Sequence, residues 1–473
     1  MNPVLFPDIL LLASAFAVLA LDLFRPRARR AAFHLAWTGP LLVFALLLLQ
    51  TGHQEHVFWG GYVVNGRGFL FKQFFALAAL FTILLSAPYF RSRTARPPIA
   101  YQGEFYAIIL FATCGMFLVV SAVDLLTLLV GMEIATIPLY ALCGFRKGCP
   151  LASEAAAKYV IMGGISTAMA VFGYSFLYGC AGSLRFDAVL DFVSRQPDSP
   201  MLLLGVLFLL AGVGFKLALF PFHMWAPDVY QGAPLPVTAF LSISSKATAV
   251  AFLAILFSGP LAPLTTRLAS TILFLAAVTM TAGNLGAMKQ TNLLRFMAYS
   301  SIAQAGYILL AFVGQSAMAQ VAVYYYLLVY GAANFVVFFI IAVVTRGDNE
   351  EVRALRGLGR NHPGLAALLM LAMFSLAGIP PLAGFTGKFM LFAVAAQEGY
   401  YWMVLFAALN STVSLYYYLL LIKEAYIVTP ESETTAVVIT PLQMAGLLPL
   451  SAAMLLFGIL PSVTTLIQKI MPY

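Results

Sequence analysis

Hydrophobic positions in this chain form long continuous runs rather than the alternating stripes of a soluble helix or strand. The runs are about 20 residues long, which is the length that an α-helix needs to cross a bilayer, and loops with Pro, Gly or charged residues separate them. This pattern predicts an all-α membrane protein with about fourteen transmembrane helices. The predicted spans are residues 3–23, 32–50, 70–90, 105–122, 124–143, 154–180, 201–222, 237–258, 266–287, 294–314, 320–344, 363–397, 400–427 and 440–460.

The composition agrees with a chain that lies almost wholly in lipid. Of its 473 residues, 62% are hydrophobic and 9% are charged, whereas soluble domains are roughly 25% charged. The formal net charge of +8 comes from basic residues in short loops, and the preference for cytoplasmic Lys and Arg explains it better than nucleic-acid binding does. The run at 3–23 lacks a preceding basic region and is followed by arginines, which predicts a membrane anchor rather than a cleaved signal peptide. We expect the lipid bilayer as a partner and no nucleic acid.

Loop charges predict the orientation, because successive loops must alternate between the two sides of the membrane. With the N-terminus outside, the cytoplasmic loops contain 16 Lys and Arg residues and the outer loops contain 6. Both termini are therefore predicted to lie on the outer side. The cytoplasmic set is Arg25, Arg27, Arg29, Arg30, Arg91, Arg93, Arg96, Arg146, Lys147, Lys289, Arg295, Arg346, Arg353, Arg356, Arg360 and Lys423, and the outer set is Arg67, Lys72, Arg185, Arg195, Arg267 and Lys469.

Two predicted spans are interrupted in a similar way. The seventh contains LAGVGFKLALFPFHMWAPDVYQGAPLP and the twelfth contains SLAGIPPLAGFTGKF. Proline removes a backbone donor and clashes with the preceding turn, so we expect both helices to be broken at membrane depth. In helices 4–8 and in helices 9–13 the broken helix comes fourth, and because five is odd, the two units must have opposite topology. The sequence therefore predicts two inverted five-helix repeats, typical of transporters with ion sites at discontinuous helices.

The predicted domain organisation follows from these repeats. Residues 1–104 form an N-terminal three-helix segment, 105–258 the first repeat and 259–427 the second. Residues 428–473 then contain the fourteenth helix.

Four ionisable residues lie deep inside predicted spans: Glu133, Lys216, Lys246 and Lys388. Glu133 is about nine residues, or roughly 13 Å, into its helix. A charge at the bilayer centre costs at least about 2.5–3.5 kcal/mol, so such residues face the bundle interior and take part in ion pathways or pair with one another. We expect a proton relay. The alternative is a structural pair between Glu133 and one lysine, which would leave the other two lysines without partners.

Further polar residues lie in or near these spans. Lys158 is a second-tier candidate, because it follows Glu154 closely and can extend to the cytoplasmic interface. His223 lies in the first helix break, where an imidazole could bridge waters between two lysines or simply cap the broken backbone. Weaker candidates are Asp228, as a helix cap, and Tyr299 and Gln304, as interhelical hydrogen-bonding residues.

The sequence contains no motif for a cofactor of its own. Cys114, Cys143, Cys149 and Cys180 show no CxxC spacing and have no His close by, and neither a GxGxxG nor a Walker pattern is present. We expect no metal, iron–sulfur cluster or nucleotide in this chain.

Three motifs are identified with a known family. PFHMWAPDVYQGAPLPVTAFLSISSKA, LRFMAYSSIAQAGY and SLAGIPPLAGFTGKF strongly resemble subunit N of bacterial proton-pumping NADH-quinone oxidoreductase, respiratory complex I. The resemblance spans nearly the whole chain. It implies an antiporter-like subunit of the membrane arm, with neighbouring antiporter-like and other membrane-arm subunits as partners, in a bacterial inner membrane. NAD, FMN, iron–sulfur clusters and quinone would then belong to partner subunits.

The resemblance also implies roles for individual residues. Glu133 and Lys216 would form the ion pair of a first half-channel, Lys246 would connect toward the centre, and Lys388 would serve a second half-channel. Many relatives have His where this chain has Gln304, so a relay there would need water or Tyr299. Alternatives are a cation/proton antiporter and an energy-converting hydrogenase subunit, which redox partners would distinguish, and a small-solute carrier, for which no pocket signature is visible.

Overall fold

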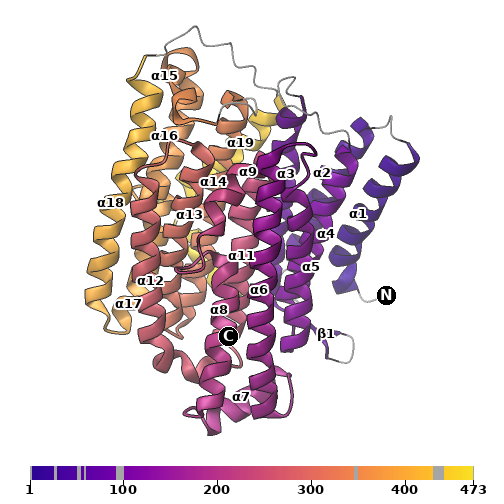
Figure 1. Ribbon diagram of the computed structural model, residues 1–473, viewed down its shortest axis with the longest axis vertical. Helices are drawn as coiled ribbons and strands as arrows, with labels where there is room; N and C mark the ends of the chain where they lie inside the picture. The colour runs from indigo at the N-terminus through magenta and orange to yellow at the C-terminus, as the bar shows by residue number, and fades with distance from the viewer. Residues whose placement is uncertain are drawn as a thin grey trace.

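The protein is a bundle of long helices that run along its longest axis (Figure 1). In this computed structural model residues 3–25, 29–50, 55–57, 60–91, 101–345, 350–429 and 441–471 are described. The helices of the first half are α1 Phe6–Phe24, α2 Arg29–Leu49, α3 Gly66–Arg91, α4 Gln102–Val120, α5 Leu125–Cys143, α6 Pro150–Ala181, α7 Phe186–Arg195, α8 Pro200–Leu217, α9 Trp225–Gly232, α10 Leu235–Phe240 and α11 Lys246–Phe257. Those of the second half are α12 Thr265–Ala287, α13 Leu293–Leu309, α14 Ala317–Thr345, α15 Leu358–Asn361, α16 Pro363–Ala377, α17 Ala383–Gln397, α18 Tyr401–Tyr426, α19 Pro441–Ile459 and α20 Ser462–Ile470.

Short elements connect the long helices. One antiparallel hairpin, β1 Glu55–Val57 and β2 Tyr62–Val64, packs on the α4–α5 junction, where the Val63 amide donates to the Ser121 carbonyl at 2.9 Å. A π-helical turn, η2, joins α10 to α11. The bounds of the short helical turns are η1 Pro3–Leu5, η2 Leu241–Ser245, η3 Ala262–Leu264, η4 Leu310–Val313 and η5 Val352–Leu355.

The predicted all-α membrane class is confirmed. Within the described residues, 12 helices are long and apolar enough to cross a membrane, and Gln443–Ile459 with Ser462–Ile470 forms one further, bent candidate. The predicted span at 363–397 consists of two 15-residue helices, α16 and α17. The count of fourteen and the inverted repeats stay predictions.

Polar caps and prolines set where several of these helices begin. The Asp124 carboxylate accepts from the Thr127 amide at 2.7 Å at the start of α5, and the Asn292 side chain accepts from two amides at the start of α13. Helices α6, α8 and α16 each begin with a proline, which has no amide hydrogen to leave unpaired in the first turn.

Both predicted helix breaks are present, and their backbone geometry is alike. After α8, the backbone of Ala218 is left-handed with φ 56°. The Ala218 amide donates to the Phe215 carbonyl, and the amide of the following residue donates to the Gly214 carbonyl. After α16, the backbone of Gly378 is left-handed with φ 86°. The Gly378 amide donates to the carbonyl three residues before it, and the amide of the following residue donates to the carbonyl five residues before its own position. Both helices therefore end in the same type of left-handed cap.

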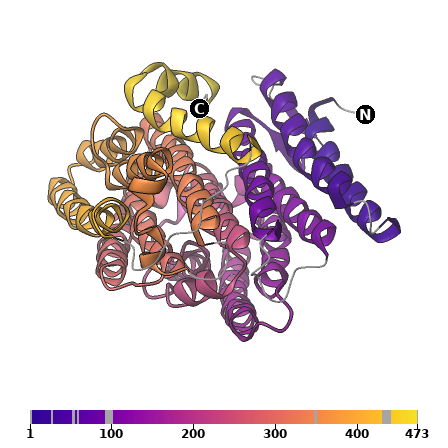
Figure 2. The same cartoon turned by 90° about the horizontal axis from the view of Figure 1, so that it is seen from above.

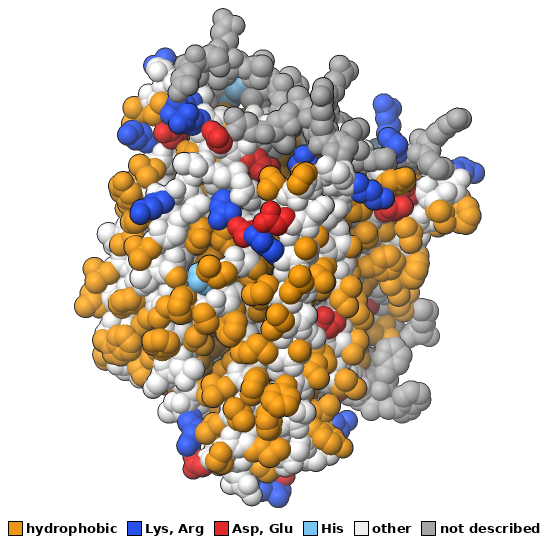
Figure 3. All heavy atoms as spheres, in the orientation of Figure 1, with side chains coloured by type: hydrophobic (Ala, Val, Ile, Leu, Met, Phe, Trp, Pro, Cys, Tyr) orange, Lys and Arg blue, Asp and Glu red, His pale blue; other side chains and the backbone are white. Residues whose placement is uncertain are grey.

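The face shown in Figure 3 is apolar around its middle and charged toward both ends, as a surface that crosses a bilayer should be. The centre of the bundle is α10–η2–α11, in which every residue of the most apolar window is buried. Helices α3 and α14 pack against it, and α13 is almost as fully buried. Helices α1, α2, α6 and α18 are peripheral and largely exposed. Residues placed on α11 and α13 are thus shielded from lipid by other helices.

Candidate functional site

The first pair of opposite charges joins α5 to the end of α8. Lys216 lies in the last turn of α8, with its side chain 5% exposed, and its Nζ is 3.6 Å from Oε1 of Glu133. The same ammonium donates to the Tyr140 hydroxyl at 3.3 Å. Glu133 is 22% exposed and also accepts a hydrogen bond from Thr167 at 2.8 Å. The carboxylate therefore has a second partner that can hold it when the lysine moves away.

Lys246 lies at the centre of the bundle. It follows the π-turn η2 directly, is 3% exposed, and donates to the Ser301 hydroxyl of α13 at 2.8 Å. Within the described residues no carboxylate forms a salt bridge with it. π-Turns inside helices often mark functional sites, and here the turn positions a lysine whose hydrogen-bonding partner is a neutral hydroxyl. Such a lysine is better placed for exchanging a proton than for a permanent ion pair.

Lys388 lies beside the second helix break. Its Nζ donates to the carbonyl of Ala377 at 3.0 Å and to the Ser411 hydroxyl of α18 at 2.9 Å. It also lies 4.6 Å from the ring centre of Tyr307. Carbonyls in the last turn of a helix have no partner within that helix, so the end of α16 at Ala377 provides an acceptor that a continuous helix would not. The break thus creates the lysine's binding position.

A buried hydrogen-bond network lies between the last two lysines. Gln304 of α13 is 1% exposed and donates to the Leu376 carbonyl and to the Tyr418 hydroxyl, each at 3.1 Å. Tyr418 contacts Ser300 at 2.6 Å, and Tyr326 donates to the Gln304 side-chain oxygen. Ser300 precedes the serine that binds Lys246, and Leu376 precedes the residue that binds Lys388. The network therefore ends one residue short of the group that binds each lysine, and no hydrogen bond among these described residues closes either gap.

The direction of three hydrogen bonds in this network can be assigned. The Leu376 carbonyl can only accept, so the Gln304 atom that faces it is the amide nitrogen. The nitrogen's second hydrogen goes to the Tyr418 hydroxyl. In the contact between Tyr418 and Ser300 either hydroxyl can be the donor. The Gln304 oxygen accepts from Tyr326. Donation therefore runs from Tyr326 to Gln304 and from Gln304 to Tyr418.

The structure places the second-tier candidate Lys158 in a charged cluster at the edge of the bundle. Its side chain is 41% exposed and its Nζ is 2.6 Å from carboxylate oxygens of both Glu154 and Asp228. Arg295 approaches the same aspartate at 2.7 Å. Asp228 therefore links α6 and α13 rather than acting only as a helix cap. Lys158 has the exposure expected of a lysine that extends to an interface.

His223 and Tyr299 both lie beside apolar or aromatic neighbours. His223 is buried in the first break, with its ring centre 5.5 Å from that of Phe220, and its Nδ1 has no hydrogen-bond partner among the described residues. The ring of Tyr299 packs against Gly286 of α12. Gln304 is bonded to Tyr326 and Tyr418 instead. The tyrosine named from the sequence is therefore not the one beside Gln304.

One buried lysine was placed wrongly by the sequence analysis. Lys72, assigned to an outer loop, lies inside α3 and is 2% exposed. Its Nζ bonds Asp8 of α1 at 2.9 Å and the Tyr62 hydroxyl at 2.7 Å. The error arose because Lys72 lies near the start of an apolar run and its carboxylate partner is 64 residues away in the chain. A pair so far apart in the sequence cannot be predicted from a local pattern of residues.

Other positions used for the orientation cannot be examined in the structure. The side chain of Arg91 and all of Arg27, Arg93, Arg96 and Arg346 lie outside the described residues. Within the described part of the chain, no cluster of three or more His, Cys, Asp or Glu residues could hold a metal ion.

Comparisons with known proteins agree with this architecture. The family model described as NADH:quinone oxidoreductase/Mrp antiporter, TM matches residues 122–414. NADH-quinone oxidoreductase subunit N of Moorella thermoacetica is 39% identical over 97% of this chain and 95% of its own length. The subunit N of Halorhodospira halophila is 37% identical over 91% of this chain and 89% of its own length.

Solved structures have the same fold. A chain of respiratory complex I from Thermus thermophilus with bound Aureothin aligns with a TM-score of 0.83 and 35% identity, over 97% of this chain and 98% of that chain. A chain of the Mrp complex from Dietzia sp. aligns with a TM-score of 0.85 at 19% identity, over 99% of this chain and 96% of that chain. The second likeness shows the fold alone.

The bundle with two broken helices and interior lysines is thus an antiporter-like membrane subunit. The chain belongs to the NADH:quinone oxidoreductase/Mrp antiporter transmembrane family, among the N subunits of NADH-quinone oxidoreductase. This confirms the resemblance drawn from the three sequence motifs.

Proposed function

We propose that this chain is a proton-translocating subunit in the membrane arm of a bacterial NADH-quinone oxidoreductase. The observation that supports this most is the series of buried lysines: Lys216 beside a carboxylate, then Lys246 and Lys388, with a hydrogen-bond network between the last two. Neighbouring antiporter-like and other membrane-arm subunits would be its partners. NADH oxidation and quinone reduction, with NAD, FMN, iron–sulfur clusters and quinone, belong to the partner subunits in this proposal.

The proposed coupling is electrostatic. Two unit charges about 4 Å apart interact by roughly 4 kcal/mol at an effective dielectric constant of 20. Separating Glu133 from Lys216 therefore removes an attraction of this size, which favours release of the lysine's proton. The Thr167 hydroxyl already bonds the carboxylate at 2.8 Å and can keep it in place while the ammonium moves. Charge shifts caused by quinone reduction elsewhere in the assembly would drive this separation.

The released proton would move toward the centre of the bundle. Between Lys216 and Lys246 the path needs water, and His223 and the Ser244 hydroxyl are buried polar groups with an unpaired atom among the described residues that could bind it. From Lys246 the path continues past Ser301 toward Lys388. Release to the outer side would follow when the Glu133–Lys216 pair re-forms. Lys158 stays outside the main path, as part of the cluster with Asp228 that would set the cytoplasmic entry.

The orientation belongs to the same proposal. The chain lies in the bacterial inner membrane with both termini on the periplasmic side, supported by the loop-charge ratio of 16 to 6. The domains 1–104, 105–258, 259–427 and 428–473 would then be an N-terminal segment, two inverted repeats and a C-terminal helix. The matching left-handed caps at Ala218 and Gly378 support the repeats.

The test is Lys216→Ala in the assembled complex, reconstituted in vesicles. Proton pumping and coupled quinone reduction should both be lost, while NADH oxidation with an artificial acceptor stays intact. Lys289→Ala is the matched control, because Lys289 is exposed and outside the route. Unchanged pumping in Lys216→Ala would refute the switch.

A second candidate is a subunit of a cation/proton antiporter, because the matching family model covers both kinds of protein. An energy-converting hydrogenase is a related alternative. Co-purification with NADH dehydrogenase activity would favour the first proposal, and an assembly without redox subunits would favour the antiporter.

A further inference from the structure

A deep apolar crevice lies between the N-terminal and C-terminal helices, apart from the proton route. It has a volume of about 450 Å³ and is bounded by α2, α3, α14, α19 and α20. Figure 2 shows the yellow C-terminal helices beside the indigo and purple N-terminal ones at one edge of the bundle. We propose that this crevice is a binding site for one acyl chain of a phospholipid.

The walls of the crevice exclude water. Of its lining residues, only Gln73 and Tyr324 have polar side chains. The Tyr324 hydroxyl already donates to the Leu70 carbonyl at 2.7 Å, and Gln73 is 7% exposed. A stably bound water needs two to four polar partners. An empty space of this size would forfeit the dispersion contacts of all its walls, so hydrocarbon is the favoured filling.

The size of the crevice selects a chain rather than a protein helix. An α-helix about 10 Å across takes up about 120 Å³ per residue, so the crevice holds about four helical residues. A membrane-spanning helix needs about 20. A flexible acyl chain is thin enough to enter, and the surrounding bilayer supplies it at high concentration.

The end of the crevice suits a phospholipid headgroup. Helix α20 is bent by 95° from the preceding helix, so it crosses the end of the bundle instead of continuing through it. Its apolar residues Val463, Leu466, Ile467 and Ile470 line the crevice. Lys469, adjacent to the last of these, is exposed. An amphipathic helix in this position lies at the membrane interface, and the lysine can bind a lipid phosphate.

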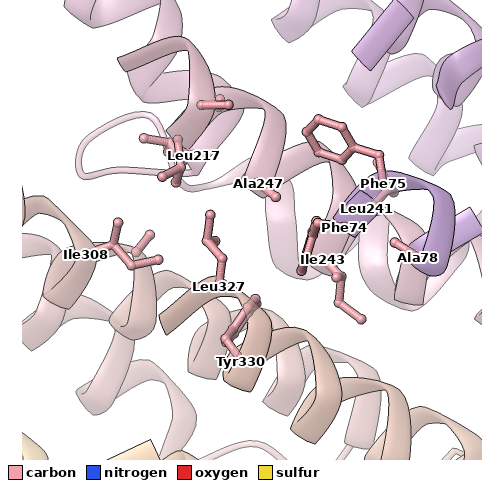
Figure 4. Packing of buried hydrophobic residues seen from close by; sticks show 14 of the residues in the cluster. Phe74, Phe75, Ala78, Leu217, Leu241, Ile243, Ala247, Ile308, Leu327 and Tyr330 are labelled. Carbon is pink, nitrogen blue, oxygen red and sulfur yellow. The ribbon is translucent and has the colours of Figure 1, made fainter. Parts of the chain in front are cut away.

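The crevice wall also contacts the π-turn η2, which positions Lys246. Figure 4 shows Phe74, which lines the crevice, close to Ile243 of the π-turn η2. A Cβ added at Gly331 of α14 would lie 3.1 Å from Phe74 and 3.3 Å from Ile243. Tyr330 donates to the Ser242 carbonyl in the same turn at 3.0 Å. An acyl chain in the crevice would therefore pack one layer behind the turn that positions Lys246. The proposal itself does not depend on proton translocation.

The test is photolabelling of the whole complex in vesicles of phosphatidylethanolamine and phosphatidylglycerol. The probe is phosphatidylglycerol with a diazirine in one acyl chain, and labelled peptides are identified by mass spectrometry. Peptides of α3, α14 and α19 that line the crevice should be labelled well above peptides of the exposed helix α18. Ala453→Phe, which fills the crevice from α19, should reduce this labelling to the α18 level. Ala408→Phe, exposed on α18, should leave it unchanged.

The headgroup is tested with Lys469→Gln. Loss of one interfacial cation, worth about 1 kcal/mol, should reduce crevice labelling by the phosphatidylglycerol probe about fivefold. Crevice labelling that equals that of α18 in the wild type, or that persists in Ala453→Phe, would overturn the proposal.

Discussion

The buried cations of this bundle differ in what their nitrogen atoms contact. Lys216 faces a carboxylate and a tyrosine, Lys246 a serine hydroxyl, and Lys388 a carbonyl and a serine hydroxyl. Lys72 instead has a closed set of partners, Asp8 and a tyrosine, that bond each other as well as the lysine. The first three sites lack such a closed set of partners, which is what the proposed proton exchange requires, whereas the fourth has the features of a fixed structural ion pair.

At the residue scale, Gln304 should set the direction of hydrogen bonding between the two inner lysines. Gln304→Glu keeps the shape but replaces the amide donor with an acceptor, so the bonds that Gln304 donates to the Leu376 carbonyl and the Tyr418 hydroxyl would be lost. Losing one such bond costs about 1 kcal/mol, which corresponds to about fivefold slower pumping. The measurement is proton uptake by vesicles, normalised to assembled complex.

The matched control for this change is Gln397→Glu, on an exposed position of α17. It should pump like the wild type. If Gln304→Glu also pumps at the wild-type rate, the amide does not direct the network.

A pH effect is expected from Glu350, which lies in the loop after α14. Burial raises the pKa of this carboxyl to about 8, although Arg146 opposes the shift. A carboxyl with a raised folded-state pKa binds more protons folded than unfolded, so its contribution to stability falls as pH rises from about 4.5 to 8. The thermal unfolding midpoint should fall over that range.

Glu350→Gln removes the titrating group and should flatten this part of the stability profile. Asp187→Asn, at an exposed position on the surface helix α7, serves as the control and should leave the decline in place. An identical decline in wild type and Glu350→Gln would contradict the assignment.

At the element scale, the two helix breaks use different residues for the same left-handed cap. At Gly378 an added Cβ would lie 2.9 Å from the Lys388 side chain, and the backbone is left-handed with φ 86°. Gly378→Ala should therefore cost about 1–2 kcal/mol of stability and displace the lysine. Ala218→Gly should be neutral or stabilising by about 1 kcal/mol, because it relieves the same penalty. Chemical denaturation of both variants checks the difference.

The sequence predicted the helix breaks and the buried lysines well, but not the contacts between side chains on different helices. Prolines next to Lys216 and Lys388 predicted both breaks, and lysines inside apolar runs stood out because charge is costly there. The Gln304 network was missed, because Tyr418 and Tyr326 are ordinary residues of apolar helices and lie 114 and 22 positions away. Which side chains meet across helices depends on packing that no local pattern specifies.

At the scale of the whole molecule, peripheral helices shield a polar centre from lipid. The exposed helices α1, α2, α6 and α18 surround α10, α11, α13 and α14, so charged and hydroxyl groups can lie inside without facing hydrocarbon. This arrangement puts Lys246 of α11 at the midpoint of the proposed route. Replacing Lys246 should therefore interrupt the whole route rather than one end of it.

The most direct measurement of the central claim is proton pumping by the assembled complex with Lys246→Met. Methionine is similar in length but cannot bind a proton, so pumping should be lost while NADH oxidation with an artificial acceptor and the assembled subunits are unchanged. If vesicles containing Lys246→Met build the same proton gradient as the wild type, the buried lysines do not form one proton route.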